Sequence, residues 1–166
     1  MNAPSASASD HAFVLLGALY CARTPTVLTT VLGSCVSICL WDRIRCAGGM
    51  NHFLLPTSRN GERSPRFGDV ATERLIQGML QLGCEASDLR AKVFGGAAVL
   101  PVGEAEACVG EQNVAAAFEH LAQRGIPVVT HRTGGRSGLV VRLHTHSGDV
   151  ELRPVGARLG AGWAGR

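Results

Sequence analysis

Short apolar runs rich in β-branched residues, separated by turn residues, fill the first third of the chain. Runs of this length and composition, bounded by Gly, Pro, Ser or Asp, are typical of β-strands. Four strands are predicted in this stretch, at residues 11–21, 26–32, 35–41 and 46–55. Gly33-Ser34 forms the turn before the third strand, and Pro56 ends the fourth.

Two later segments instead place apolar residues at helical spacing. In the first, Leu75, Ile76 and Met79 share one side between Asp69, the predicted N-cap, and Gly83, the predicted stop.

The second helix is predicted from Glu111 to Arg124. Val114, Phe118 and Leu121 fall on one stripe of it, which should pack inward. Residues 99–108, which precede this helix, are predicted to form an irregular loop.

The remaining strands are predicted at residues 89–94 and 126–130, and as a hairpin of residues 139–145 and 150–153. Because strands outnumber helices and short turns join most of them, the pattern favours an α+β fold. It would have mixed, largely antiparallel sheets with two main helices packed on them. We expect a single domain over residues 12–155, between a flexible N-terminal tail (1–11) and a loose C-terminal tail (156–166).

Composition narrows the function classes. With 46% hydrophobic and 17% charged residues among 166, the chain is that of a globular protein. The net charge is +3, without runs of basic residues, and there is a single Tyr, so the sequence does not predict nucleic-acid binding. No apolar run approaches the roughly eighteen residues of a membrane span, and the N-terminus lacks the features of a signal peptide. We therefore expect a cytoplasmic protein without membrane insertion, whose six cysteines are free thiols.

Cys35 is the strongest candidate for chemistry. It directly follows the Gly33-Ser34 turn, where a thiol is exposed and backbone N–H groups lie close to its sulfur. His52 follows seventeen residues later, enough for one strand out and one strand back. Antiparallel pairing would bring His52 alongside Cys35, as a Cys–His nucleophile requires. The amides of Ser34 and Cys35 could also form an oxyanion hole.

A third group usually orients the imidazole of such a pair. Thr29 and Thr30 lie on the strand that enters the turn, and their side chains point to opposite faces, so only one can reach His52. Asn51 adjoins His52 and should face away from it. Asp42 and Asp69 are open alternatives.

Other polar and glycine-rich features carry weaker signals. Six histidines could act as bases: His11, His52, His120, His131, His144 and His146. The pair His144 and His146 would share one side of a strand, but the sequence offers no third ligand, so no metal site is predicted. Gly95-Gly96 and Gly134-Gly135 lack a phosphate-loop pattern and are expected to form tight turns near a cleft.

Two blocks of residues are specific enough to identify a family. Residues 32–36 (Leu-Gly-Ser-Cys-Val) and 48–56 (Gly-Gly-Met-Asn-His-Phe-Leu-Leu-Pro) resemble the CheD family of bacterial chemoreceptor glutamine deamidases. Further matches are residues 92–97, 110–114 and 133–136, so the resemblance covers nearly the whole domain. One departure is the sequence Gly110-Glu111-Gln112-Asn113 at the start of the second helix.

The resemblance implies a function and a site. The family is similar in active-site plan to cytotoxic necrotizing factor toxins, which deamidate a protein glutamine. By position in the motif, the implied triad is Cys35, His52 and Thr29, with Gly33 and Ser34 at the oxyanion turn. Gly95, Gly96 and Asn51 are candidates for lining the cleft. A layered α/β sandwich and a cytoplasmic location are also implied.

The implied substrates are methyl-accepting chemotaxis receptors, and the implied partner in some members is a CheC-type phosphatase. No metal or organic cofactor is required, and a side activity on glutamyl methyl esters fits the same chemistry. The alternative from another class is a binding module that regulates receptors or a CheC-type phosphatase without turnover. A cysteine peptidase ranks last, because the local signatures of those enzymes are missing.

Overall fold

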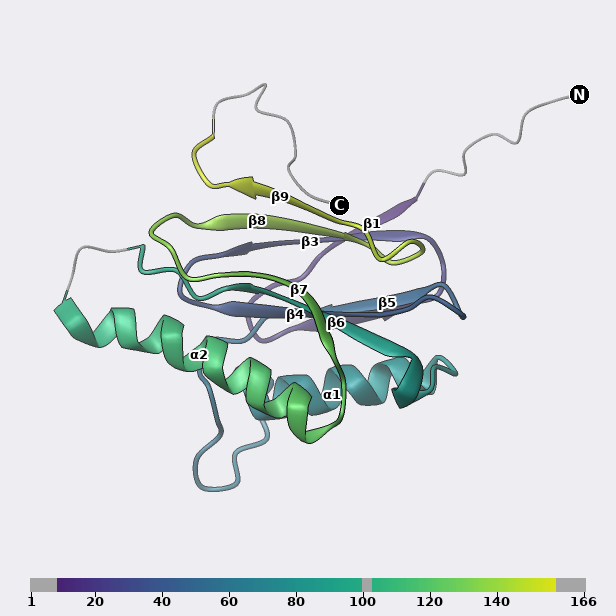
Figure 1. The fold of residues 1–166 in the computed structure, drawn as a ribbon, viewed down its shortest axis with the longest axis horizontal. Coiled ribbons are helices and arrows are strands. Elements are labelled where there is room, and N and C mark those ends of the chain that lie inside the picture. The colour runs from purple at the N-terminus through teal and green to yellow at the C-terminus, as the bar shows by residue number, and fades with distance from the viewer. Residues whose placement is uncertain (1–8, 100–102, 158–166) are drawn as a thin grey trace, which may run out of the picture.

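The structure, a computed structural model, describes residues 9–99 and 103–157, with only the main chain for residues 103–108. Two sheets and two helices form three layers (Figure 1). One sheet has the strand order β1-β3-β8-β9 and the other has the order β2-β5-β4-β6-β7. The strands of the first sheet are β1 (Asp10–Phe13), β3 (Thr26–Leu32), β8 (Leu139–His144) and β9 (Val150–Pro154). Those of the second are β2 (Leu19–Ala22), β5 (Ala47–Asn51), β4 (Val36–Asp42), β6 (Leu89–Gly95) and β7 (Val128–Thr133).

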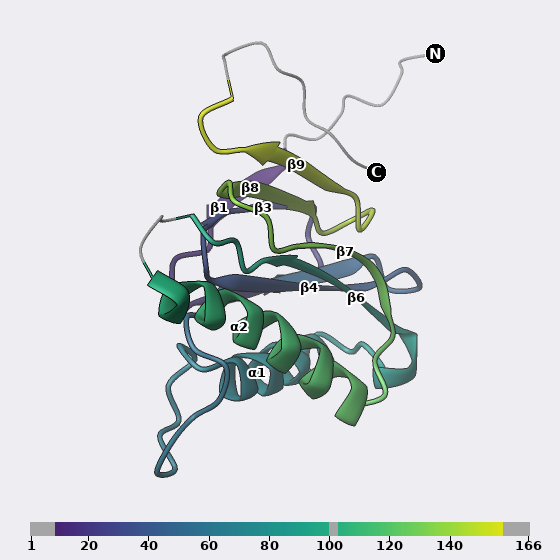
Figure 2. The ribbon, with the colours of Figure 1, turned by 60° about the vertical axis from the view of Figure 1, so that its left-hand side comes forward.

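Both helices cover one face of the five-stranded sheet, and the four-stranded sheet covers the other (Figures 1 and 2). The helices are α1 (Gly68–Gln81) and α2 (Gly103–Gln123), and a short 3-10 helix, η1 (Ala86–Asp88), leads into β6. Most strand pairs are antiparallel, whereas β1–β3 and β6–β7 are parallel. The predicted fold of mixed, largely antiparallel sheets with two packed helices is confirmed.

Side chains alternate along β4 between two separate cores. Val36, Ile38 and Leu40 pack against the helices, while Cys39 packs into the core between the sheets. Successive residues of a strand point to opposite faces, so the central sheet supplies apolar residues to both cores. On β3, Leu28 and Leu32 face the core between the sheets. Residues of β3 that alternate with them therefore point into the same core.

Three expectations about element boundaries are wrong. The run at residues 11–21 is two strands, because Gly17 turns the chain with φ +75° between β1 and β2. Residues 103–108 are helical rather than irregular, which agrees with the good helix formers Glu and Ala of Glu104-Ala105-Glu106-Ala107. The N-cap of α1 is Phe67, and Asp69 lies in the first turn.

The predicted tails fall mostly outside the described residues. At the N-terminal side, β1 begins at Asp10 and pairs with β3, so residues 10 and 11 belong to the sheet rather than to the tail. Among the described residues, no helix is long and apolar enough to cross a membrane.

Candidate active site

The turn that carries Cys35 is fixed by hydrogen bonds from other segments to its three backbone carbonyl groups. The Gly33 carbonyl accepts from the Ala97 N–H at 2.9 Å, and the Cys35 carbonyl accepts from the Gly96 N–H at 2.8 Å. Between them, the Ser34 carbonyl accepts from Asn113 Nδ2 at 3.1 Å. Three successive carbonyls therefore bind two neighbouring segments: the one just beyond β6, and α2. The N–H groups of Ser34 and Cys35 donate to no oxygen of the described residues, and that of Cys35 hydrogen-bonds to its own sulfur.

Gly95 and Gly96 permit this close approach. Their φ values of +107° and +71° are ones that residues with a side chain rarely adopt. A Cβ on Gly95 would overlap the Cys35 carbonyl oxygen, and a Cβ on Gly96 would overlap the Val114 side chain. Of these two glycines, both predicted to line the cleft, Gly95 lines a surface cavity, and both hold the Cys35 turn in place.

Asn113 is a site residue that the sequence reasoning missed. It is fully buried, and its Nδ2 also donates to the Leu54 carbonyl at 2.8 Å. One amide from α2 thus joins the Cys35 turn to the segment just beyond His52. The available signal was its spacing: Asn113 lies four and eight residues before Ala117 and Leu121, which are both fully buried. A polar residue within an apolar stripe indicates a specific buried hydrogen bond.

The strand register places His52 diagonally across from Cys35. Val36 and Phe53 exchange both backbone hydrogen bonds, at 3.1 and 3.0 Å, just beyond the β4–β5 ladder. This register puts Ser37 opposite His52, so Cys35 and His52 share one face and lie one diagonal apart, within reach of long side chains. The face is the one that looks toward the four-stranded sheet. The expected out-and-back path between the two residues is confirmed.

The turn between β1 and β2 binds the backbone of His52. The His52 N–H donates to the Ala18 carbonyl at 3.1 Å, and the His52 carbonyl accepts from the Gly17 N–H at 2.8 Å. The same turn begins at Val14, whose carbonyl lies 3.5 Å from His52 Nδ1. With 7% of its surface exposed, the imidazole is largely withdrawn from water.

Thr30 fixes the tautomer of this imidazole. Its hydroxyl lies 2.7 Å from the Val14 carbonyl and 2.9 Å from His52 Nδ1. A carbonyl can only accept, so the hydroxyl proton of Thr30 goes to Val14. The Thr30 oxygen then accepts from His52, which places the imidazole proton on Nδ1. The other nitrogen, Nε2, carries the lone pair and is buried without a partner among the described residues.

Thr29, which the resemblance implied as the third residue, does not make this contact. Thr30 alternates with Leu28 and Leu32 on the inner face of β3, whereas Thr29 alternates with the exposed Val31 on the outer face. The backbone carbonyl of Thr29 accepts from the Val14 N–H at 2.8 Å. The hydroxyl at His52 therefore comes from the other sheet, across the core, and not from a strand paired with β5.

Burial favours the neutral forms of both Cys35 and His52. Burial raises the pKa of the Cys35 thiol, and a hydrogen bond from its own backbone N–H offsets part of that rise. Burial lowers the pKa of His52, and the hydrogen bond to the Val14 carbonyl works in the opposite direction. Near neutral pH, these two directions leave the Cys35 thiol protonated and the His52 imidazole uncharged.

The remaining candidates lie elsewhere or serve the fold. Asn51, a predicted cleft residue, is fully buried, and its Oδ1 accepts from the Ile38 N–H at 2.8 Å, so the cleft assignment is wrong. Asp69 accepts from the N–H and hydroxyl of Ser58 at 3.0 and 2.8 Å and anchors the loop before α1.

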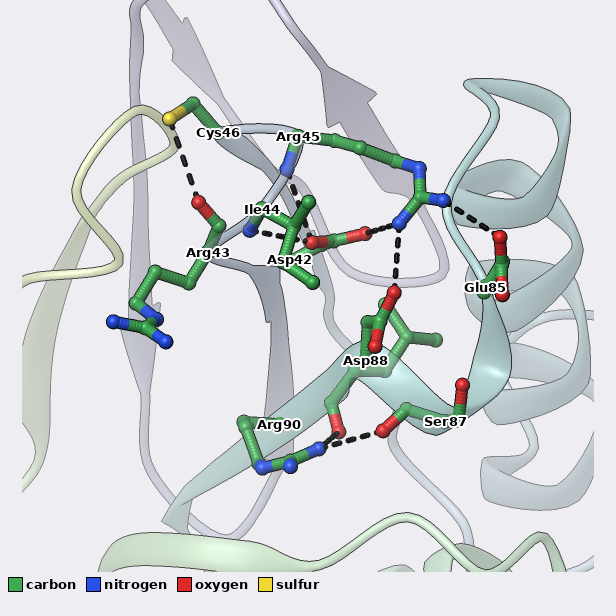
Figure 3. A network of polar contacts seen from close by, with 10 residues as sticks. Asp42, Arg43, Ile44, Arg45, Cys46, Glu85, Ser87, Asp88 and Arg90 are labelled. Atoms are coloured by element: carbon green, nitrogen blue, oxygen red, sulfur yellow. Dashed lines mark hydrogen bonds and ion pairs between the residues drawn. The ribbon is translucent and has the colours of Figure 1, made fainter.

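Asp42 belongs to an ion-pair network at the far end of β4 (Figure 3). Arg45 Nη1 lies 3.1 Å from Asp42 and 2.8 Å from Asp88, and its Nη2 lies 2.8 Å from Glu85. Burial acts to raise the pKa of Asp42, but hydrogen bonds from Arg45 and the Ile44 N–H outweigh it and hold that pKa below its usual value. This network stabilises the β4–β5 turn and does not reach His52.

The other histidines have separate surroundings. His120 Nε2 lies 3.2 Å from the Pro56 carbonyl, His131 packs edge-on against Phe118, and His144 Nε2 lies 3.0 Å from Glu151. Within residues 9–99 and 103–157, no group of three or more His, Cys, Asp or Glu side chains could hold a metal ion.

Comparisons with known proteins identify relatives of this chain. Residues 54–154 match the family described as CheD chemotactic sensory transduction. A Rhodospirillum rubrum protein named "Probable chemoreceptor glutamine deamidase CheD" is 54% identical over 86% of this chain and 81% of its own length. A Trichlorobacter lovleyi protein of the same name is 41% identical over 84% and 88% of the two chains. A third, from Anaeromyxobacter dehalogenans, is 37% identical over 92% and 89%.

Among solved structures, the Bacillus licheniformis hypothetical protein YfiH aligns with a TM-score of 0.46 and 15% identity, over 72% of this chain and 50% of that one.

Proposed function

This chain belongs to the CheD family, and on that premise we propose that it is a chemoreceptor glutamine deamidase with Cys35 as its nucleophile. The observation that carries the proposal is the hydrogen-bonded series from the Val14 carbonyl through the Thr30 hydroxyl to His52 Nδ1. That series leaves the basic Nε2 unpaired on the face that Cys35 shares. Thr30, rather than Thr29, is proposed as the residue that orients the imidazole.

Acyl transfer to Cys35 begins with proton transfer. His52 Nε2 takes the thiol proton, and the sulfur attacks the side-chain amide carbon of the substrate glutamine. The tetrahedral oxyanion is stabilised by the N–H groups of Ser34 and Cys35, which bind no oxygen of the described residues at rest. As the C–N bond breaks, His52 returns its proton to the departing nitrogen, and ammonia leaves a thioester on Cys35.

Hydrolysis of the thioester reverses these roles. His52 Nε2 takes a proton from water, whose oxygen attacks the acyl carbon. The C–S bond then breaks, the Cys35 sulfur recovers the proton, and a glutamate side chain remains. While the imidazole is transiently charged, its Nδ1–H donates to Thr30 and keeps the ring from rotating. A glutamyl methyl ester would react by the same steps, with methanol in place of ammonia.

A pH profile tests the neutral resting pair. Because burial lowers the pKa of His52, its Nε2 stays free to accept a proton to more acidic pH than an ordinary histidine would. As pH falls through that lowered pKa, imidazolium forms and activity is lost. We therefore expect the acid limb of kcat/KM to lie below pH about 6.5, the ordinary histidine value.

Alkylation by iodoacetamide provides the matching measurement on the thiol. Since the pKa of Cys35 is raised, its labelling rate should still be increasing above pH about 8.5, the ordinary cysteine value. A labelling rate that levels off near neutral pH would show a preformed thiolate–imidazolium pair and contradict this description.

Mass spectrometry of chemoreceptors tests the function itself. Purified receptors incubated with the protein should gain about one mass unit at specific glutamines and release one ammonia for each, since deamidation replaces NH₂ by OH. Protein alkylated beforehand with iodoacetamide is the control. Receptors that bind the protein with no mass change would favour the alternative, a regulatory binding module.

Two finer points accompany the proposal. A cytoplasmic location is supported by the free thiols of all five cysteines whose side chains the structure describes. Binding of a CheC-type phosphatase is supported only by the family resemblance, and its test is whether such a phosphatase competes with receptors for this protein.

A further inference from the structure

A surface cavity lies at the same end of the molecule as the Cys35 turn. It has a volume of about 260 Å³ and is lined by Gly33 of that turn and by Gly95, which packs against the turn. Five strand ends meet around it, because Leu32, Gly95, Thr133 and Pro154 end β3, β6, β7 and β9, and Leu139 begins β8. The cavity is smaller than the 300–1,000 Å³ typical of small-molecule sites. Its size suits one side chain of a bound polypeptide.

Two arginines give the cavity a positive charge. Arg132, at the end of β7, and Arg136, in the glycine-rich segment that follows, both line it. No described residue that lines the cavity is acidic. Neither guanidinium makes an ion pair or hydrogen bond with any part of the chain that the structure describes. Elsewhere in the protein, by contrast, Arg45, Arg124 and Arg142 are each paired with a carboxylate.

The β7 register places Arg132 on the inner side of its sheet. Arg132 pairs with Phe94 of β6, whose side chain packs into the core between the sheets, so the two side chains share a face. Arg132 thus approaches the cavity from the five-stranded sheet. The following turn is tied down by the Gly134 N–H, which donates to the Gly95 carbonyl at 2.9 Å. Arg136 is therefore carried by a segment anchored directly to the backbone next to Cys35.

We propose that Arg132 and Arg136 bind a carboxylate side chain of the substrate polypeptide near the target glutamine, and so determine which glutamines react. A planar guanidinium matches a carboxylate with two parallel hydrogen bonds. Gly33 lies two residues before Cys35 and lines this cavity, so an acidic neighbour of a glutamine bound at Cys35 can enter it. The inference rests on the proposed deamidase function and adds the basis of its selectivity.

Peptide kinetics test this proposal. The substrates are short peptides that contain one receptor glutamine that the protein deamidates. In each peptide, one position near that glutamine carries Glu, and the uncharged reference peptide carries Gln at the same position. At one or more positions, Glu should raise kcat/KM about tenfold, a value typical of hydrogen bonds to charged groups. The gain should appear in KM, since the carboxylate binds away from the reacting carbon.

Matched variants assign the effect to the cavity. R132Q and R136Q should abolish the preference for Glu, so that the Glu and Gln peptides react with the same kcat/KM; a preference kept by both variants overturns the proposal. R43Q removes the same charge from an exposed arginine in the β4–β5 turn, at the opposite end of β4 from Cys35, and should keep the preference. If R43Q reduces the preference as much as R132Q does, the effect is one of overall charge and the proposal is overturned. It is also overturned if no position favours Glu.

A second measurement separates this proposal from the proposed function. If no peptide is deamidated, the function fails, and binding of fluorescently labelled peptides to wild type and to R132Q/R136Q tests the cavity alone. If wild type binds the Glu peptide more tightly than the Gln peptide and R132Q/R136Q does not, the cavity's role in recognition is supported. Equal binding by both proteins overturns it.

Discussion

Cys35→Ala should lower the rate of ammonia release from receptors by at least about 10⁴-fold, as expected when a covalent nucleophile is removed. The side chain is only partly buried and packs at the edge of the core between the sheets. Its loss should therefore change the free energy of unfolding by no more than about 1 kcal/mol. Activity and thermal unfolding, measured on the same preparation, separate the two effects.

Cys39→Ala is the matched control for this experiment. Cys39 lies on the same face of the same segment, is 1% exposed, and burial raises the pKa of its thiol to about 12. It should be unreactive toward iodoacetamide, and its alanine variant should retain the activity of the wild type. Activity in folded Cys35→Ala, or its loss in folded Cys39→Ala, would show that the nucleophile is wrongly assigned.

Thr30→Val should reduce kcat about 10- to 100-fold with little change in KM, a range suited to impaired general base catalysis. Valine keeps the shape of threonine but cannot accept from His52 Nδ1–H or donate to the Val14 carbonyl. The imidazole is then free to turn or change tautomer, so Nε2 is less often ready for the thiol proton. Because a buried carbonyl loses its partner, we also expect a loss of about 1–3 kcal/mol in the free energy of unfolding.

Two further variants decide whether Thr30 acts through its hydroxyl. Thr30→Ser keeps the hydroxyl and should restore most of the turnover. Thr29→Val changes the neighbouring threonine, on the outer face of the sheet, and should have nearly wild-type kcat. If Thr29→Val is the slow variant and Thr30→Val is not, the triad implied by the family motif is correct and the hydrogen bond to Thr30 is not catalytic.

The local part of the site could be predicted from the sequence because it depends on short-range rules. Gly33-Ser34 predicts a turn, and the apolar segments on either side of residues 42–45 predict two strands. Antiparallel pairing then brings Cys35 and His52 to one face. Each step uses neighbours in the chain, so one sequence is enough.

The choice between Thr29 and Thr30 needed tertiary information. The contact with His52 crosses the core between two sheets, so it depends on which face of β3 points inward. Leu28 and Leu32 could have served as the guide, since they alternate with Thr30 and are buried at 0% and 1% exposure. The motif position instead favoured Thr29. Asn113 was missed for a similar reason, because its partners lie 79 and 59 residues away.

The carbonyl groups held by Gly96, Ala97 and Asn113 have a consequence for folding. Residues 33–52 form one continuous motif, yet the donors that fix its turn come from the segment just beyond β6 and from α2. Opening of α2 alone would release the Ser34 and Leu54 carbonyls while both sheets stayed paired. Catalytic activity thus depends on the whole cooperative unit. Local unfolding of α2 would abolish the activity before the strands separate.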